Sequence, residues 1–307
     1  MKSRSILFLW LGLSLVASAS ADPLRKTFAF GGVERVYLVD LPSAATARRE
    51  PLPLVLVFHG GTLGSATQAE KNYGFRELAE QKNFIAVFPD GIDHHWNDGR
   101  DGGLASVRAI DDLAFIGALL EQLATDYRID PKRLYTAGIS NGAIFSYALA
   151  AKYGGRFAAM GSVAGALAQP LASTFALKEP VSVIAFHGSA DKIVPSTGGL
   201  VLGEVGGHVL SVTDTLQLFI KADGCSPDPL SEILPAHVPS DGTVVRREAH
   251  TGGRGGSAVV LYSIEGGGHT WPGGPVSKIY TAIAGPTTET ISATLLMWEF
   301  FSQHPKP

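Results

Sequence analysis

Cysteine is nearly absent from this sequence: Cys225 is the only one in 307 residues. An internal disulfide is therefore excluded, even in a compartment that would permit one. No motif of a cysteine enzyme surrounds Cys225, so we do not expect a catalytic thiol. Because cysteine is among the most often buried residue types, we expect a buried side chain at this position.

Long apolar runs are also scarce, and the only marked one lies at the start of the chain. Residues 6–16 are apolar, the basic residues Lys2 and Arg4 precede them, and the small residues 19–21 follow. This is the pattern of a secretory signal peptide, and the run is shorter than the roughly 20 residues that a membrane span needs. We therefore predict that residues 1–21 are a signal peptide, and that residues 22–307 are exported to the periplasm or beyond without a membrane anchor.

Charge of one sign is not concentrated anywhere. The formal net charge is −3, and it falls to −5 without Lys2 and Arg4. No basic block is present, which argues against nucleic acid or an anionic membrane as a partner. Asp93, His94, His95 and Asp98 do not match a zinc or calcium spacing, so we expect no metal. The glycines of residues 252–256 precede a strand rather than a helix, so they do not predict a nucleotide site, and we expect no cofactor.

Strand-like and helix-like segments alternate along the chain. The run at residues 54–58 is wholly apolar, as in a strand that is buried on both faces. Alternation of this kind predicts an α/β fold with a mostly parallel central sheet and helices on both faces, here as a single domain over residues 22–307. We expect strands at residues 26–30, 33–41, 54–58, 84–88, 133–139, 160–163, 181–186, 244–249 and 258–264, and helices at 70–81, 111–127, 143–152, 213–222 and 289–301.

The segment Gly138-Ile139-Ser140-Asn141-Gly142 stands between a predicted strand and a predicted helix. Gly-x-Ser-x-Gly in this context is the nucleophile elbow, a tight turn that exposes the serine hydroxyl at the edge of the sheet. We therefore predict that Ser140 is a catalytic nucleophile.

A serine nucleophile needs a base to take its proton and an acid to orient that base. On the elbow fold these follow in the order serine, acid, histidine. Asp191 comes just after the predicted strand 181–186, and His269 lies in a glycine-rich loop after the strand 258–264. We predict Asp191 as the acid and His269 as the base.

The remaining parts of such a site are donors for the oxyanion and a wall for the substrate. We expect the backbone N–H groups of Asn141 and Gly61 to form the oxyanion hole, because Gly61 lies in the loop after the first buried strand. We expect the Thr62 hydroxyl to assist in binding the substrate. Trp96 and Trp271 are candidates for the substrate wall, with packing of the loops as the alternative role.

Together these motifs resemble those of the secreted poly(3-hydroxybutyrate) depolymerase and feruloyl esterase family, over about residues 26–302. The resemblance implies an α/β-hydrolase fold, a metal-free serine mechanism and carboxylic ester substrates. It also places Ser140, Asp191 and His269 at the triad positions, and Gly61 and Asn141 at the oxyanion positions. The motifs that carry it are His59-Gly60-Gly61-Thr62, Phe88-Pro89-Asp90-Gly91 with Trp96-Asn97, Gly138-Ile139-Ser140-Asn141-Gly142, His187-Gly188-Ser189-Ala190-Asp191 and Gly268-His269-Thr270-Trp271-Pro272-Gly273-Gly274.

The chain departs from this family in two respects. Members often carry further cysteines, one of them in the oxyanion loop, whereas here that loop has Gly61 and Cys225 has no partner. Enzymes that degrade the solid polymer usually add a polymer-binding domain, and none follows the last predicted helix. We therefore expect soluble esters or short oligomers as substrates.

The sequence thus predicts a secreted serine carboxylic ester hydrolase that acts on feruloyl or acetyl esters or on hydroxyalkanoate oligomers through an acyl-enzyme. Two alternatives use the same scaffold. An exported serine peptidase would share the triad, but no propeller-like domain that would gate peptides is present. A catalytically idle binding protein would be expected to have lost a triad member, and all three are here. No pattern fixes the oligomeric state.

Overall fold

The computed structural model describes residues 22–46, 50–102, 109–204, 206–235, 241–275 and 278–307. The predicted signal peptide, residues 1–21, lies outside the described residues.

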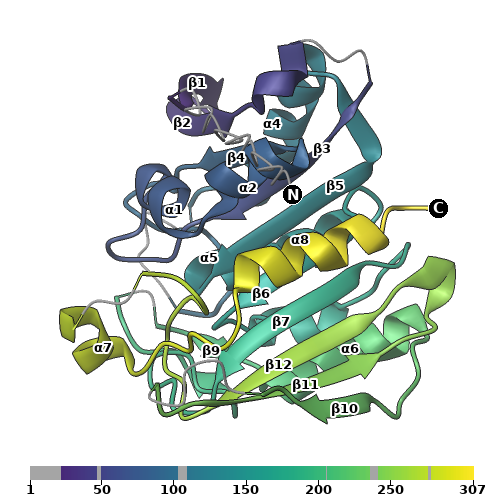
Figure 1. Cartoon of the computed structure of the whole chain (residues 1–307). Coiled ribbons are helices and arrows are strands. Elements are labelled where there is room, and N and C mark those ends of the chain that lie inside the picture. Colours follow the sequence, from purple (N-terminus) through teal and green to yellow (C-terminus); the bar gives the residue numbers. More distant parts are fainter. Residues whose placement is uncertain (1–21, 47–49, 103–108, 205, 236–240, 276–277) are drawn as a thin grey trace, which may run out of the picture.

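A ten-stranded sheet runs through the molecule in the order β1-β2-β4-β3-β5-β6-β7-β12-β11-β10 (Figure 1). The six central strands, from β4 to β12 in this order, pair in parallel, and the two strands at each edge pair antiparallel. The predicted α/β fold with a mostly parallel sheet is therefore confirmed. The strands are β1 Leu24–Phe30, β2 Val33–Asp40, β3 Leu52–Phe58, β4 Ile85–Pro89, β5 Ile129–Ile139, β6 Ala159–Val163, β7 Ser182–Gly188, β10 Leu230–Ile233, β11 Val244–His250 and β12 Val259–Glu265.

Helices bury both faces of this sheet. In β3, Val55 and Val57 pack into one core cluster, and the alternate residues Leu54, Leu56 and Phe58 pack into another. This period of two follows from the pleat of a strand, and it explains why the strand is apolar throughout. Helices α1, α2 and α8 cover one face, and α4, α5 and α6 cover the other. Their bounds are α1 Ala66–Asn72, α2 Phe75–Lys82, α4 Asp112–Asp126, α5 Asn141–Tyr153, α6 Val212–Asp223 and α8 Ala293–Gln303.

The helix predicted over residues 70–81 is two helices in the structure. α1 ends at Asn72 and α2 begins at Phe75, and between them Gly74 has φ of 73°. That left-handed conformation, which glycine adopts without a steric penalty, interrupts the helix. The prediction of one continuous helix was wrong because the apolar spacing continues across the break.

Polar side chains cap the first turns of α4 and α8. Asp111 caps α4, since its carboxylate accepts a hydrogen bond from Ala114 N at 2.9 Å. The last helix begins at Ala293 rather than near residue 289, and Ser292 is its N-cap. Leu295 lies on the solvent side of this helix and is 49% exposed.

Several short elements were not predicted. They are the hairpin strands β8 Gly199–Leu200 and β9 His208–Val209, the edge strand β10 and the helix α7 Lys278–Ala284. Cys225 is buried, as expected. Across the part of the chain that is described, no helix combines the length and the apolar character that crossing a membrane requires.

Candidate active site

Ser140 stands at the junction between the end of β5 and the start of α5. Its φ of 55° and ψ of −124° are unusual for a residue with a side chain, and they mark the strained turn of a nucleophile elbow. Ser140 N donates to Val163 O at 2.9 Å, and Ser140 O accepts from Ile144 N at 2.9 Å. The turn is therefore fixed on both sides of the serine.

The two glycines of the elbow are required by close backbone contacts. A Cβ atom at Gly138 would lie 2.5 Å from the carbonyl of Gly142. A Cβ atom at Gly142 would lie 2.5 Å from the carbonyl oxygens of Phe58 and His59. The absence of both side chains lets α5 begin directly against the end of β3, which brings the serine close to the loop that follows β3.

Asp191 and His269 form a buried pair at the same edge of the sheet. His269 Nδ1 donates to Asp191 Oδ2 at 2.8 Å. The other carboxylate oxygen, Oδ1, accepts from the N–H groups of Ile193 and Val194, both at 2.9 Å. Three donors thus hold a carboxylate whose side chain has no exposed surface, and it fixes the orientation of the imidazole.

Adjacent parallel strands bring these two loops together. Asp191 follows β7 and His269 follows β12, and the two strands are hydrogen-bonded neighbours. Gly268 lies so close to the end of α7 that a Cβ atom would be 2.0 Å from Ala284 O. His269 N also donates to Ala284 O at 2.6 Å. The glycine-rich loop predicted to hold the base therefore allows a close contact that positions His269.

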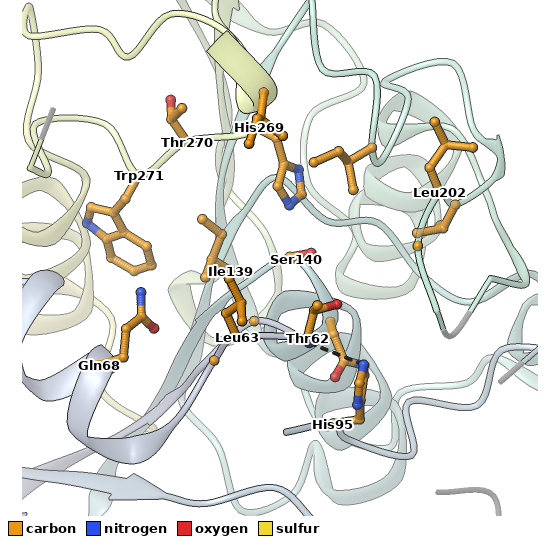
Figure 2. A pocket seen from close by; sticks show the side chains of 18 of the residues that line it. Thr62, Leu63, Gln68, His95, Ile139, Ser140, Leu202, His269, Thr270 and Trp271 are labelled. Carbon is orange, nitrogen blue, oxygen red and sulfur yellow. Dashed lines mark hydrogen bonds between the residues drawn. The ribbon is translucent and has the colours of Figure 1, made fainter. Parts of the chain in front are cut away.

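Ser140 and His269 line one pocket of about 580 Å³. Figure 2 shows the imidazole of His269 directed toward Ser140 across this pocket. The structure therefore brings together the three residues that were predicted as a triad. Most of the pocket wall is apolar, and its aliphatic side chains are Leu63, Ile139, Ile193, Val201, Leu202 and Ile283.

The predicted oxyanion loop lies against the elbow. A Cβ atom at Gly60 would be 3.5 Å from Ser140 Cβ, and one at Gly61 would be 3.6 Å from Asn141 Cβ. Asn141 is the first residue of α5, where backbone N–H groups have no acceptor within the helix. Gly61, Thr62 and Asn141 all line the pocket. The two predicted donors therefore flank the serine.

His95 supports this loop, a role that was not predicted from the sequence. Its Nδ1 donates to Asp93 O at 2.5 Å, which leaves Nε2 to accept from Thr62 N at 3.2 Å (Figure 2). A Cβ atom at Gly61 would be 3.0 Å from His95 Cδ2. The ring therefore packs directly behind the predicted oxyanion donor.

The two predicted wall tryptophans have different positions. Trp271 lines the pocket and stacks on Tyr73, with ring centroids 4.4 Å apart and planes at 3°. Trp96 does not line the pocket: it is 0% exposed and stacks on Phe145 beneath the site. The prediction of Trp96 as a wall residue was wrong, since the polar loop around it folds inward and buries the indole.

His187 is a second histidine beside the acid that the sequence had not assigned. It is buried at the end of β7, where its Nε2 donates to Val194 O at 2.8 Å and lies 3.6 Å from Asp191 Oδ2. Burial lowers the pKa of His187 below its usual value, although the Asp191 carboxylate acts in the opposite direction. A neutral His187 thus braces Val194, the residue whose N–H binds Asp191.

The two histidines considered for a metal bind backbone groups. His94 Nδ1 bonds to Gly64 O at 2.7 Å, and both nitrogens of His95 are engaged as described above. Among the described residues, no group of three or more histidine, cysteine or acidic side chains has a metal-binding arrangement.

The site thus combines a serine elbow, an Asp–His pair and a glycine loop around one pocket, and the chain that forms it is similar to known proteins. The model of the family described as esterase PHB depolymerase matches residues 35–192. The chain belongs to this family. This matched region contains the oxyanion loop, the elbow and Asp191, and the predicted family resemblance is confirmed.

Individual relatives of this chain are also named as esterases. The chain is similar to the putative esterase NocK of Nocardia uniformis subsp. tsuyamanensis, with 29% identity over 282 residues, 89% of this chain and 81% of that protein. It is also similar to feruloyl esterase B of Piromyces equi, with 26% identity over 239 residues, 76% of this chain. The match spans only 42% of the length of that enzyme.

A solved structure of similar fold is acetyl xylan esterase from Aspergillus awamori. Its TM-score is 0.58 at 15% identity, and the match covers 92% of this chain and all of that one. This likeness supports the α/β-hydrolase fold and nothing finer. The activity rests on the family and on the sequence relatives, which make the chain a serine carboxylic ester hydrolase, as the sequence predicted.

Proposed function

We propose that Ser140 is the nucleophile of this esterase, His269 its general base and Asp191 the acid that orients His269. Ser140 attacks the ester carbonyl while His269 accepts the hydroxyl proton, and His269 then protonates the leaving alcohol. Water releases the acyl group from Ser140 by the same steps. The observation that carries this proposal is the 2.8 Å bond between His269 and Asp191 at the pocket that Ser140 lines.

The negative charge that develops on the ester oxygen needs donors. We assign this role to the backbone N–H groups of Gly61 and Asn141, with Thr62 beside them. The apolar pocket wall, including Trp271, favours an acyl or alcohol group with apolar surface. Feruloyl-type and acetyl-type esters and hydroxyalkanoate oligomers are the substrate classes that we propose, and the name of the Piromyces relative supports the first. Export of residues 22–307 after removal of residues 1–21 is part of the same proposal.

A panel of esters tests this function. Residues 22–307 and their Ser140→Ala variant would be assayed on p-nitrophenyl acetate and butyrate, methyl ferulate, 3-hydroxybutyrate oligomers and a peptide amide. We expect ester turnover that falls at least about a thousandfold in the variant, the scale seen when a triad member is removed. Equal activity of a folded Ser140→Ala protein would refute the assignment, and faster amide cleavage would indicate a peptidase.

A further inference from the structure

The buried Trp96 lies between the two segments that carry the proposed oxyanion donors. We propose that Trp96 is a positioning residue, which fixes the backbone N–H groups of Gly61 and Asn141 relative to each other. This inference rests on the proposed function, because it concerns the hole that would stabilise the reaction catalysed by Ser140.

The backbone of Trp96 holds Asn141. Trp96 N donates to Asn141 Oδ1 at 2.8 Å, and Asn141 Nδ2 donates to Trp96 O at 3.0 Å. Asn141 Nδ2 also donates to Asp98 Oδ2 at 2.6 Å. Three bonds to one buried amide leave the side chain a single orientation, and they restrain the backbone of the residue that follows the serine.

The side chain of Trp96 holds the other loop. Its indole Nε1 donates to His59 O at 3.1 Å, two residues before Gly61. The neighbouring His95 accepts from Thr62 N, one residue after Gly61. The consecutive residues His95 and Trp96 therefore fix the chain on both sides of the proposed donor.

Packing makes this connection rigid. The indole stacks on Phe145 of α5, with ring centroids 5.0 Å apart, and meets Phe58 of β3 edge to face at 5.1 Å. Phe58 and Phe145 also contact each other at 5.2 Å. The three rings join the end of β3 to the start of α5, the two elements from which the donors extend.

The segment that contains Trp96 is itself anchored in the core. Asn97 N donates to Asp112 Oδ2 at 2.8 Å, and Arg35 binds the other oxygen of that carboxylate at 2.7 Å. Arg100 forms an ion pair with Asp98 at 2.8 Å, with both side chains almost fully buried. Trp96 is thus attached to fixed structure on each side, so it can act as a reference point for the two loops.

Oxyanion donors stabilise the transition state only when they lie about 2.7–3.1 Å from the charged oxygen. A small change in the separation of Gly61 and Asn141 therefore lowers kcat, whereas the uncharged substrate, which depends little on these donors, binds as before. A merely structural tryptophan would affect stability without this separation of kcat from KM.

The test is Trp96→Phe, which keeps a ring on Phe145 and removes the N–H that binds His59 O. Its control is Trp298→Phe in α8, a buried tryptophan stacked on Phe84 at 4.2 Å and remote from the pocket. For both variants we would measure Tm, kcat and KM for p-nitrophenyl butyrate, and inhibition by an alkyl trifluoromethyl ketone, which serine enzymes convert to a charged tetrahedral adduct.

We expect Trp96→Phe to lower kcat about tenfold or more and to weaken inhibition by the ketone by a similar factor. Its KM should stay within about twofold of the wild-type value. Trp298→Phe should leave kcat, KM and inhibition by the ketone unchanged. If Trp96→Phe does not fold, Asn141→Ala carries the test, because it keeps the backbone donor and loses the bonds to Trp96. We expect the same pattern from it.

Two results would overturn the proposal: equal kcat in Trp96→Phe and Trp298→Phe, or a fall in kcat without weaker binding of the ketone. An assay of Ser140→Ala beside them distinguishes failure of the proposed role of Trp96 from failure of the proposed function. If Ser140→Ala is inactive and Trp96→Phe behaves as its control, only the role of Trp96 fails. If Ser140→Ala is fully active, the proposed function fails as well.

Discussion

His269 and Asp191 are 78 residues apart in the chain, yet His269 Nδ1 lies 2.8 Å from Asp191 Oδ2. Since a carboxylate accepts hydrogen bonds, Nδ1 carries the hydrogen, and the proposed role as base falls to Nε2. Two adjacent parallel strands, β7 and β12, bring the pair together.

Asp191→Asn tests this relationship. An amide at this position can present its NH₂ group to His269 and favour the wrong tautomer, so kcat should fall by about three to four orders of magnitude with little change in KM. Steady-state kinetics on p-nitrophenyl acetate measure this, with circular dichroism to verify folding. A fall of less than about tenfold would show that Asp191 does not orient the base.

The exposed rim of the pocket offers a paired test of substrate binding. Leu202 lines the pocket and Leu200 does not, and both are 54% exposed. Leu202→Asp should lower kcat/KM for p-nitrophenyl butyrate by about tenfold and for the acetate by less, because a longer acyl chain loses more apolar contact. Leu200→Asp is the control and should leave both values unchanged. A similar loss in both variants would show that the added negative charge, rather than a lost contact in the pocket, lowers kcat/KM.

Asp40 makes a pH-dependent contribution to stability. Burial raises its pKa to about 7, helped by the charge of Glu70, and neither carboxylate oxygen has a hydrogen-bond partner among the described residues. The folded pKa exceeds the unfolded value of 3.8, so the folded state keeps a proton that the unfolded state releases. The contribution of Asp40 to the free energy of unfolding is therefore largest below about pH 4 and is lost as the pH rises toward 7.

Asp40→Asn removes this titration and stays neutral. We expect the variant to exceed the wild type in free energy of unfolding by about 2 kcal/mol at pH 8 and to equal it at pH 4, with the full effect reduced by partial solvation. Urea unfolding at the two pH values measures the difference. An advantage that is the same at both would contradict a buried, protonated Asp40.

Gly142→Ala probes the elbow. In a helix, alanine is more favourable than glycine by about 1 kcal/mol, so helix propensity alone predicts a more stable protein. Here the added Cβ would lie 2.5 Å from the carbonyl oxygens of Phe58 and His59, so we expect a lower Tm and a loss of activity. Gly155→Ala is the control, since its nearest atom would be 3.8 Å away. A Gly142→Ala protein with normal Tm and activity would show that the contact relaxes easily.

The sequence predicted the sheet and pointed to the proposed triad because their signals are mostly local. The apolar run of β3 and the small-residue turn around Ser140 are each readable within a few residues, and the chain order then selects Asp191 and His269. The break at Gly74 was missed because the apolar periodicity does not stop there. β10 was missed because its four residues are all exposed and carry no periodic pattern.

The position of Trp96 could not be read from its neighbours. The residues around it are mostly polar, and the indole is buried by packing against Phe58 and Phe145, which are distant in sequence. The same holds for His187 and His95, whose bonds to Val194 and Thr62 depend on how the loops fold back. The framework of the site follows from local sequence, whereas its supports follow from tertiary contacts.

The central claim is that Ser140 becomes acylated, and covalent labelling tests it most directly. Residues 22–307 would be treated with a p-nitrophenyl alkylphosphonate, which transfers its phosphonyl group to an activated serine and releases p-nitrophenolate. Intact mass and peptide mapping would then locate the label. The account predicts one adduct per chain on Ser140, with no adduct in Ser140→Ala or after acid unfolding. A label on another residue, or none on a folded protein that hydrolyses esters, would contradict it.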